Sequence, residues 1–163
     1  MTHAPLRLSR GIVRPEWIDF NGHMNVAYYM LAFDDATTVF FEHLGIGEGY
    51  MERTNCSTFT LEGHITYDRE VKEGDVLEFA TRLLDFDSKR LHYFHEMYHV
   101  EQGYLASTSE LITAPIDMSV RRMTPFGAET LKRLEALMEA HRDLPRVPQI
   151  GRTVGIRHKA AVG

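Results

Sequence analysis

The residues best suited to catalysis lie in one stretch, Asp19-Phe20-Asn21-Gly22-His23-Met24-Asn25. It brings a carboxylate, an imidazole and two amides together around a glycine. A carboxylate beside an electrophilic carbonyl can act as general base for water or attack the carbonyl carbon itself. A neutral imidazole has one donor and one acceptor, so His23 could bind a carbonyl or brace the loop. The stretch is therefore the first candidate for a catalytic site, with Asp19 as its central group.

An apolar run follows directly and has the period of a helix. Its positions are Val26, Tyr29, Met30, Phe33, Ala36, Thr37, Phe40, Phe41 and Leu44. Asn25 is a favourable N-cap, and Gly45 stands where a left-handed C-terminal residue belongs. The pattern predicts one amphipathic helix of about five turns. Its N-terminus offers unpaired N–H donors and a partial positive charge, which suit the polarisation of a carbonyl close to Asp19.

Strand patterns surround this helix. Alternation predicts strands over 6–13, 56–67, 76–86, 90–100 and 104–116, and the last four are joined by turns too short for crossover helices, so they pair antiparallel. In the strand 56–67 we expect one apolar face (Phe59, Leu61, Ile65, Tyr67) and one polar face (Thr58, Thr60, Glu62, His64, Thr66). A lone apolar helix needs an apolar sheet face to bury it. The sequence thus predicts an α+β fold, a curved antiparallel sheet of about five strands wrapped around one long central helix.

A C-terminal helix completes the predicted domain. Pro125 stands at its start, where proline is well tolerated, and an apolar stripe runs through Phe126, Leu131, Leu134, Leu137 and Met138. The glycine-rich run 45–49 is predicted to be a flexible loop. Residues 1–141 are expected to form a single domain. Residues 142–163, with prolines, glycines and basic side chains, form a tail that is either flexible or docked on a neighbour.

The composition and charge of the chain limit which functions are compatible with it. The chain has 163 residues, a net charge of −5 and one cysteine. The negative balance argues against nucleic acid as a partner, and the single cysteine fits a reducing compartment, so we expect a cytoplasmic protein. No apolar run reaches membrane-spanning length, so we expect no membrane association. Nine histidines raise the question of a metal site, but His92, His95 and His99 fall on one predicted strand, where only the last two share a face; we expect no metal.

The motif Asp19-x-x-Gly22-His23-x-Asn25, followed by a helix that bears Tyr and Phe, resembles the 4-hydroxybenzoyl-CoA-type acyl-CoA thioesterases of the hot-dog fold. The resemblance covers roughly residues 6–140. The turn Glu73-Gly74-Asp75, which opens a strand, matches a Gly-Asp found there in many hot-dog enzymes. Segments 59–67 and 89–97 are similar to a narrower branch, the thioesterase part of carnitine-catabolism proteins, whose acyl group is betainyl.

The resemblance implies an enzyme that hydrolyses a short, polar acyl-CoA, such as betainyl-CoA, to the free acid and CoA. The resemblance implies that Asp19 would act on the thioester as general base or nucleophile, and that N–H groups at the helix start would polarise the carbonyl. From their types and places we add His23 and Asn25 as catalytic candidates: His23 could bind the thioester or only brace the loop, and Asn25, the N-cap, could also fix the loop around Asp19. The family needs no metal, and we expect no cofactor. Such folds usually dimerise by joining two sheets, with the acyl site between protomers. We therefore expect a homodimer or homotetramer.

Several residues are candidates for substrate binding: Gly22, Met24, Trp17, Tyr28, Glu62, His64 and Arg90. Gly22 would let backbone approach the ligand closely. A trimethylammonium group would need aromatic faces such as those of Trp17, Tyr28, Tyr29 and Phe33, with negative charge from Glu62. The alternative for such aromatic residues is core packing.

Two further candidates have equally plain alternatives. Glu62 and His64 share a strand face and could assist Asp19, or that face could simply be solvated or lie between subunits. Arg90 could meet the phosphates of CoA or belong to the ordinary charged surface.

Two other functions are compatible with these residues. A hot-dog hydratase or dehydratase would act on an acyl thioester with His23 or His64 as general acid and base. A non-catalytic module would bind acyl-CoA or a partner protein without releasing thiol. Release of free thiol from saturated acyl-CoAs separates the hydrolase from both.

Overall fold

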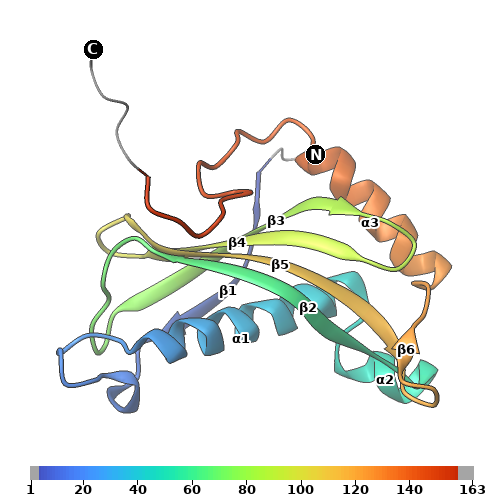
Figure 1. The fold of residues 1–163 in the computed structure, drawn as a ribbon, viewed down its shortest axis with the longest axis horizontal. Helices are drawn as coiled ribbons and strands as arrows, with labels where there is room; N and C mark the ends of the chain where they lie inside the picture. The colour runs from blue at the N-terminus through green and yellow to red at the C-terminus, as the bar shows by residue number, and fades with distance from the viewer. Residues whose placement is uncertain (1–3, 158–163) are drawn as a thin grey trace.

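The computed structural model describes residues 4–157 and consists of a curled antiparallel sheet around one long helix (Figure 1). The helix, α1, spans Val26–Leu44. The strands are β1 (Leu6–Ile12), β2 (Cys56–Tyr67), β3 (Val76–Phe86), β4 (Leu91–His99) and β5 (Leu105–Asp117), in the order β1-β3-β4-β5-β2. All neighbours pair antiparallel. The predicted hot-dog architecture is confirmed.

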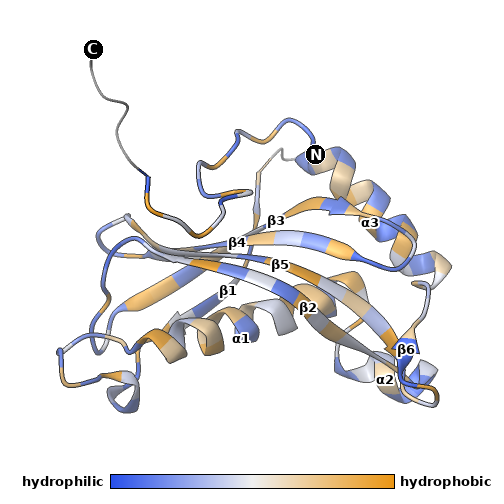
Figure 2. Ribbon diagram, viewed as in Figure 1, coloured by the Kyte–Doolittle hydropathy of each residue, from blue (hydrophilic) through white to orange (hydrophobic). Residues whose placement is uncertain are grey.

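Both ends of α1 are fixed as predicted. The Asn25 side chain accepts a hydrogen bond from the Ala27 N–H, and Gly45 closes the helix in the left-handed conformation with φ 78°. Figure 2 shows α1 as largely apolar, lying on the concave side of a sheet whose strands alternate in hydropathy. Two positions of the predicted stripe, Val26 and Met30, are exposed. They lie on the flank of the helix that the sheet leaves uncovered.

Three small elements escaped the sequence patterns. A 3-10 turn, Pro15–Trp17, precedes the catalytic-loop candidate. The run predicted as a loop after Gly45 instead leads into a short helix, α2 (Glu48–Thr54), whose first N–H at Glu48 donates to the Glu42 carboxylate over 2.7 Å. A two-residue strand, β6 (Arg122–Met123), pairs with β5.

A bulge in β2 overturns the predicted split of its two faces. The pairing with β5 shifts between Thr60 and Glu62, which leaves Leu61 as the extra residue. Before the bulge, Cys56 and Thr58 line a cavity beside α1. After it, Ile65 and Tyr67 face the helix instead. Phe59 therefore does not share a face with Ile65 and Tyr67, because one inserted residue exchanges the two sides.

The C-terminal helix, α3 (Ala128–His141), begins later than Pro125 predicts, with Gly127 as its N-cap. It packs along β3 beyond the stretch that β1 pairs. There the His141 Nδ1 accepts a hydrogen bond from the Leu83 N–H over 2.9 Å. A strand edge that would otherwise present unpaired backbone groups is covered in this way.

Residues 142–157 lie against the chain's own sheet, on the face opposite α1 (Figure 1). The Pro145 carbonyl accepts from Arg82, which also forms a buried ion pair with Glu96 at 2.7 Å. Further along, the Gly151 N–H donates to Glu110 over 2.7 Å. Residues 158–163 of the predicted tail lie outside the described residues. None of the described helices is long and apolar enough to cross a bilayer.

A polar group sits inside the core between α1 and the sheet. The His95 ring is completely buried, with Nε2 2.9 Å from the Thr37 hydroxyl and Nδ1 2.8 Å from the Thr81 hydroxyl. It stacks on Phe33 and meets Tyr93 edge-on. Burial lowers the pKa of His95 from its ordinary 6.5 to about 3. The ring is therefore neutral in the folded protein near neutral pH.

This burial predicts an acid-sensitive fold. Below pH 6.5 the unfolded chain protonates His95 while the folded chain does not, so the free energy of unfolding falls as the pH drops. At pH 5 the loss from this one group is about 2 kcal/mol. Urea unfolding of His95→Gln should show a weaker decline between pH 7 and pH 5 than the wild type. The exposed His43 offers the matched control, His43→Gln, which should keep the wild-type slope. An unchanged slope in His95→Gln would contradict the assignment.

Candidate active site

The loop that carries the motif is a tight hairpin between the 3-10 turn and α1. The Gly22 N–H donates to the Asp19 carbonyl over 2.9 Å, and the Asp19 N–H donates to the His23 carbonyl over 3.2 Å. Gly22 has φ +77°, a conformation that side chains with a Cβ rarely adopt, which explains the glycine at this turn. Two backbone bonds anchor the loop's return, from Met24 N–H to the Val71 carbonyl and from Asn25 N–H to the Trp17 carbonyl, each 2.8 Å.

The carboxylate of Asp19 is held from two sides. Its Oδ1 accepts from the Asn21 N–H over 2.8 Å, and its Oδ2 accepts from the Asn25 side-chain amide over 3.2 Å. The Asn21 backbone donor, aided by the Asn25 amide and the nearby His23 ring, holds the pKa of Asp19 below its usual range. The group is partly exposed. It is therefore an ionised carboxylate, fixed in orientation and open to a small molecule.

Asn25 connects this carboxylate to the helix. Its Nδ2 donates to Asp19, while its Oδ1 accepts from the Ala27 N–H over 3.0 Å. The Tyr28 N–H donates to the Asn25 carbonyl. Within residues 4–157 the Val26 N–H donates to no acceptor, so it remains a free donor at the positive end of α1. The site thus pairs a carboxylate with a donor for a developing negative charge.

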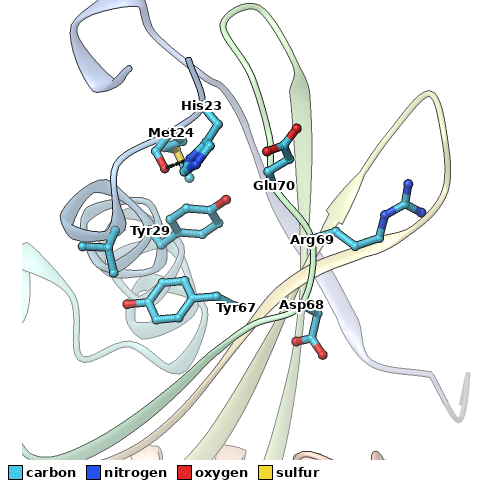
Figure 3. A pocket seen from close by; sticks show the side chains of 8 residues that line it. His23, Met24, Tyr29, Tyr67, Asp68, Arg69 and Glu70 are labelled. Carbon is cyan, nitrogen blue, oxygen red and sulfur yellow. Dashed lines mark hydrogen bonds between the residues drawn. The ribbon is translucent and has the colours of Figure 1, made fainter. Parts of the chain in front are cut away.

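A cavity of about 290 Å³ opens beside this helix end. Figure 3 shows the side chains around it, which come from the loop, from α1 and from the segment that follows β2. The lining residues are His23, Met24, Val26, Tyr29, Tyr67, Asp68, Arg69 and Glu70. The His23 Nδ1 lies 3.2 Å from the Met24 carbonyl oxygen, which makes it the donor there and leaves Nε2 as an acceptor. His23 and Met24 thus lie where a bound acyl group could reach them.

Trp17 and Tyr28, two of the predicted substrate-binding residues, lie outside the cavity. Trp17 is buried and stacks on Tyr28 with ring centroids 5.6 Å apart, and the Arg14 guanidinium lies over the indole at 5.3 Å. Neither aromatic residue lines the cavity. Their packing supports the loop from behind, and the indole face already holds a cation.

Three other predicted residues lie away from the helix end. Glu62 and His64 line a separate cavity of about 220 Å³ on the opposite face of the sheet, beneath the tail. Arg90 lies in the turn between β3 and β4 and pairs with Asp87. Within one chain the structure does not bring these three side chains to Asp19.

The segment His95-Glu96-Met97-Tyr98-His99 has the HExxH spacing of many zinc sites, but it is a strand here. On a helix the two histidines would lie one turn apart, whereas four strand steps separate them by about 13 Å. Both nitrogens of His95 are taken by threonine hydroxyls, and Glu96 points to the other face, toward Arg82. Within residues 4–157 no cluster of three or more His, Cys, Asp or Glu side chains is placed to hold a metal ion.

The far wall of the cavity was not predicted from the sequence. Tyr67 ends β2, and Asp68, Arg69 and Glu70 follow it. The N–H groups of Asp68 and Arg69 both donate to the Ala106 carbonyl, which fixes this segment beside α1. The motif gave no hint of it because the wall lies more than forty residues downstream. The sequence signal that could have indicated this wall is the run of alternating charges, 68–70, directly after Tyr67.

Several known proteins are similar to this chain in sequence. A family model described as the thioesterase-like superfamily matches residues 13–134. A betainyl-CoA thioesterase from Pseudomonas aeruginosa is 41% identical over 144 residues, which is 88% of this chain and 91% of that protein. An L-carnitine dehydrogenase/betainyl-CoA thioesterase from Rhizobium meliloti is 32% identical over 93% of this chain, which spans 30% of that longer protein.

Solved structures show the same fold. A Staphylococcus aureus protein determined in complex with CoA superimposes with a TM-score of 0.82 at 31% identity, covering 94% of this chain and 98% of that one. A Pseudomonas putida structure gives a TM-score of 0.81 at 32% identity, with the same coverage. The chain therefore belongs to the thioesterase-like superfamily and has its hot-dog fold.

Proposed function

We propose that the protein is an acyl-CoA thioesterase that hydrolyses a short, polar acyl-CoA to the free acid and CoA. The observation that carries the proposal is the Asp19 carboxylate, oriented by Asn25 beside the free N–H at the start of α1. The 41% identity to a betainyl-CoA thioesterase supports the same activity and favours a betainyl acyl group. An acyl-CoA substrate and a single cysteine also favour a cytoplasmic location.

The reaction follows from this geometry. The thioester oxygen accepts from the Val26 N–H, so the helix end stabilises the negative charge that forms on that oxygen. Asp19 either takes a proton from an attacking water or attacks the carbonyl carbon itself. In both routes the C–S bond of the tetrahedral intermediate then breaks, and the sulfur leaves as CoA thiolate, which takes up a proton. In the nucleophilic route this leaves the acyl group on Asp19 as an anhydride, which water then hydrolyses to the free acid and the Asp19 carboxylate. His23, with its Nε2 free, lies beside the acyl group and can orient it.

Asp19→Asn tests the proposal. The amide is isosteric but cannot act as base or nucleophile, so kcat for thiol release should fall by about 10²–10⁴. The melting temperature should stay close to that of the wild type, because the side chain is partly exposed. Asp35→Asn, at an exposed position of α1, is the matched control and should keep wild-type turnover. Near wild-type turnover of Asp19→Asn on the best acyl-CoA would refute the assignment.

The assay should include saturated and enoyl-CoAs, with betainyl-CoA among the saturated ones. Free thiol from saturated substrates indicates hydrolysis. Hydration of enoyl-CoA without thiol release would indicate a hydratase, and binding without either reaction would indicate a non-catalytic module. In single-turnover reactions in ¹⁸O water, label that enters the protein at Asp19 identifies a nucleophile, because only water that attacks the aspartyl carbon of an anhydride puts oxygen there.

We further propose that the protein is a homodimer formed along β2. This strand pairs only with β5 among the described strands, and its free edge exposes Phe59 by 40% and Leu61 by 49%. Val26 and Met30 on α1 are exposed apolar side chains as well. A second copy joined to β2 would lie next to Tyr67, so the cavity would open between protomers.

A charge at this edge should separate the protomers. Leu61→Lys places an ammonium group where the partner would pack, so light scattering should show a mass near that of one chain instead of two. Ile12→Lys, at an exposed position on the opposite edge strand β1, is the matched control and should leave the mass unchanged. A wild-type protein that has the mass of one chain at micromolar concentration would contradict the dimer.

A further inference from the structure

We propose that the cavity at the start of α1 is a binding site for a quaternary ammonium group, held by the rings of Tyr29 and Tyr67 and the carboxylate of Glu70. The inference rests on the proposed thioesterase function, and it assigns the residues that select a cationic acyl group. Of the residues that the sequence offered for this group, the proposal keeps Tyr29 and leaves out Trp17, Tyr28, Phe33 and Glu62.

The two tyrosines form an aromatic corner. Their ring centroids lie 5.2 Å apart and their planes meet at 88°. Tyr29 projects from the first turn of α1 and Tyr67 from the end of β2, and Figure 3 shows both rings bordering the open space of the cavity. A methylated ammonium group is attracted to ring faces and needs no hydrogen-bond acceptor. Two rings at right angles can contact such a group from two sides.

Glu70 supplies the negative charge. Asp68 also lines the cavity, but its two oxygens accept from the Thr66 hydroxyl and the Gln149 amide, over 2.8 and 3.1 Å. Among residues 4–157 the Glu70 carboxylate pairs only with the Lys72 ammonium, at 3.4 Å, and both of these side chains are more than half exposed, so the pair is weak. Figure 3 shows the Glu70 carboxylate across the cavity mouth from His23. A bound cation can therefore replace Lys72 as its partner.

Arg69 also lines the cavity, but its positive charge is directed away from the place where a cation would bind. The Arg69 guanidinium lies over the Tyr104 ring, 3.8 Å from the centroid, and Figure 3 shows it turned away from the two tyrosines. By contrast, the stacked pair Trp17 and Tyr28 already carries Arg14, and Glu62 faces a different cavity. Of the aromatic residues that the sequence offered, Tyr29 lines the cavity, whereas Phe33 is completely buried in the core.

The cavity also lies at the right distance from the group that would bind the thioester carbonyl. Val26, whose N–H would bind the thioester oxygen, lines the same cavity as both tyrosines. In a trimethylammonium-acetyl thioester the nitrogen is two bonds from the carbonyl carbon. A carbonyl held at the helix N-terminus therefore puts the methyl groups within the cavity instead of in bulk water.

A charged and a neutral substrate of the same shape test the site. Trimethylammonium-acetyl-CoA and 3,3-dimethylbutyryl-CoA differ only in the nitrogen that replaces a carbon. The wild type should prefer the charged substrate in kcat/KM. Glu70→Gln and Tyr67→Leu should each lower kcat/KM for the charged substrate by about tenfold and leave the neutral substrate within twofold. Tyr67→Phe, which keeps the ring, should restore the preference.

The control is Glu73→Gln, an exposed acid on the following turn that does not line the cavity; it should leave both substrates unchanged. Light scattering of Tyr67→Leu shows whether the assembly is intact, and Glu70→Gln tests the site independently of it. Equal loss on both substrates, or no preference in the wild type, would overturn the ammonium site while the thioesterase activity stands. Absence of thiol release from every acyl-CoA would instead overturn the proposed function.

Discussion

The candidate site depends on the two hydrogen bonds that the Asn25 side chain makes. One end of its amide caps α1 through the Ala27 N–H, and the other end donates to the Asp19 carboxylate. The same group therefore fixes where the helix begins and where the carboxylate points. Because α1 is buried along the concave face of the sheet, the position of this amide is set by the core. The packed core thereby holds the partly exposed loop that carries Asp19 in one orientation.

The sheet serves the site in two further ways. Its curl brings the end of β2 back to the first turn of α1, so Tyr67 and Tyr29 meet although they are distant in sequence. Its opposite face carries a polar layer, with the Arg82–Glu96 pair and Glu110, that would be costly to leave unpartnered. Residues 142–157 cover part of that layer with backbone groups. The chain thus uses its apolar side for the helix and its polar side to hold its own C-terminal segment.

Sequence patterns predicted the architecture well because its signals are local. The caps of α1, the strand lengths of β3 and the turn residues are all readable from neighbouring positions. The motif residues Asp19, Gly22, His23 and Asn25 do meet around one helix end. What was not predictable depends on tertiary contacts. The start of α2 rests on a carboxylate from α1, and the bulge at Leu61 is invisible to a rule of strict alternation. The far wall of the cavity depends on how β2 folds back over the helix.

The contact between Gln149 and Asp68 links the C-terminal segment to the wall of the cavity. Asp68 follows Tyr67 directly, and its carboxylate is shared between Thr66 and the Gln149 amide over 3.1 Å. The segment that forms this wall is thus tethered by residues about eighty positions away. A chain that ended just after α3 would lack Gln149, so Asp68 would keep its bonds to Thr66 and to the Ala106 carbonyl but lose this one. Changes near the C-terminus can therefore alter the wall of the cavity without touching any residue that lines it.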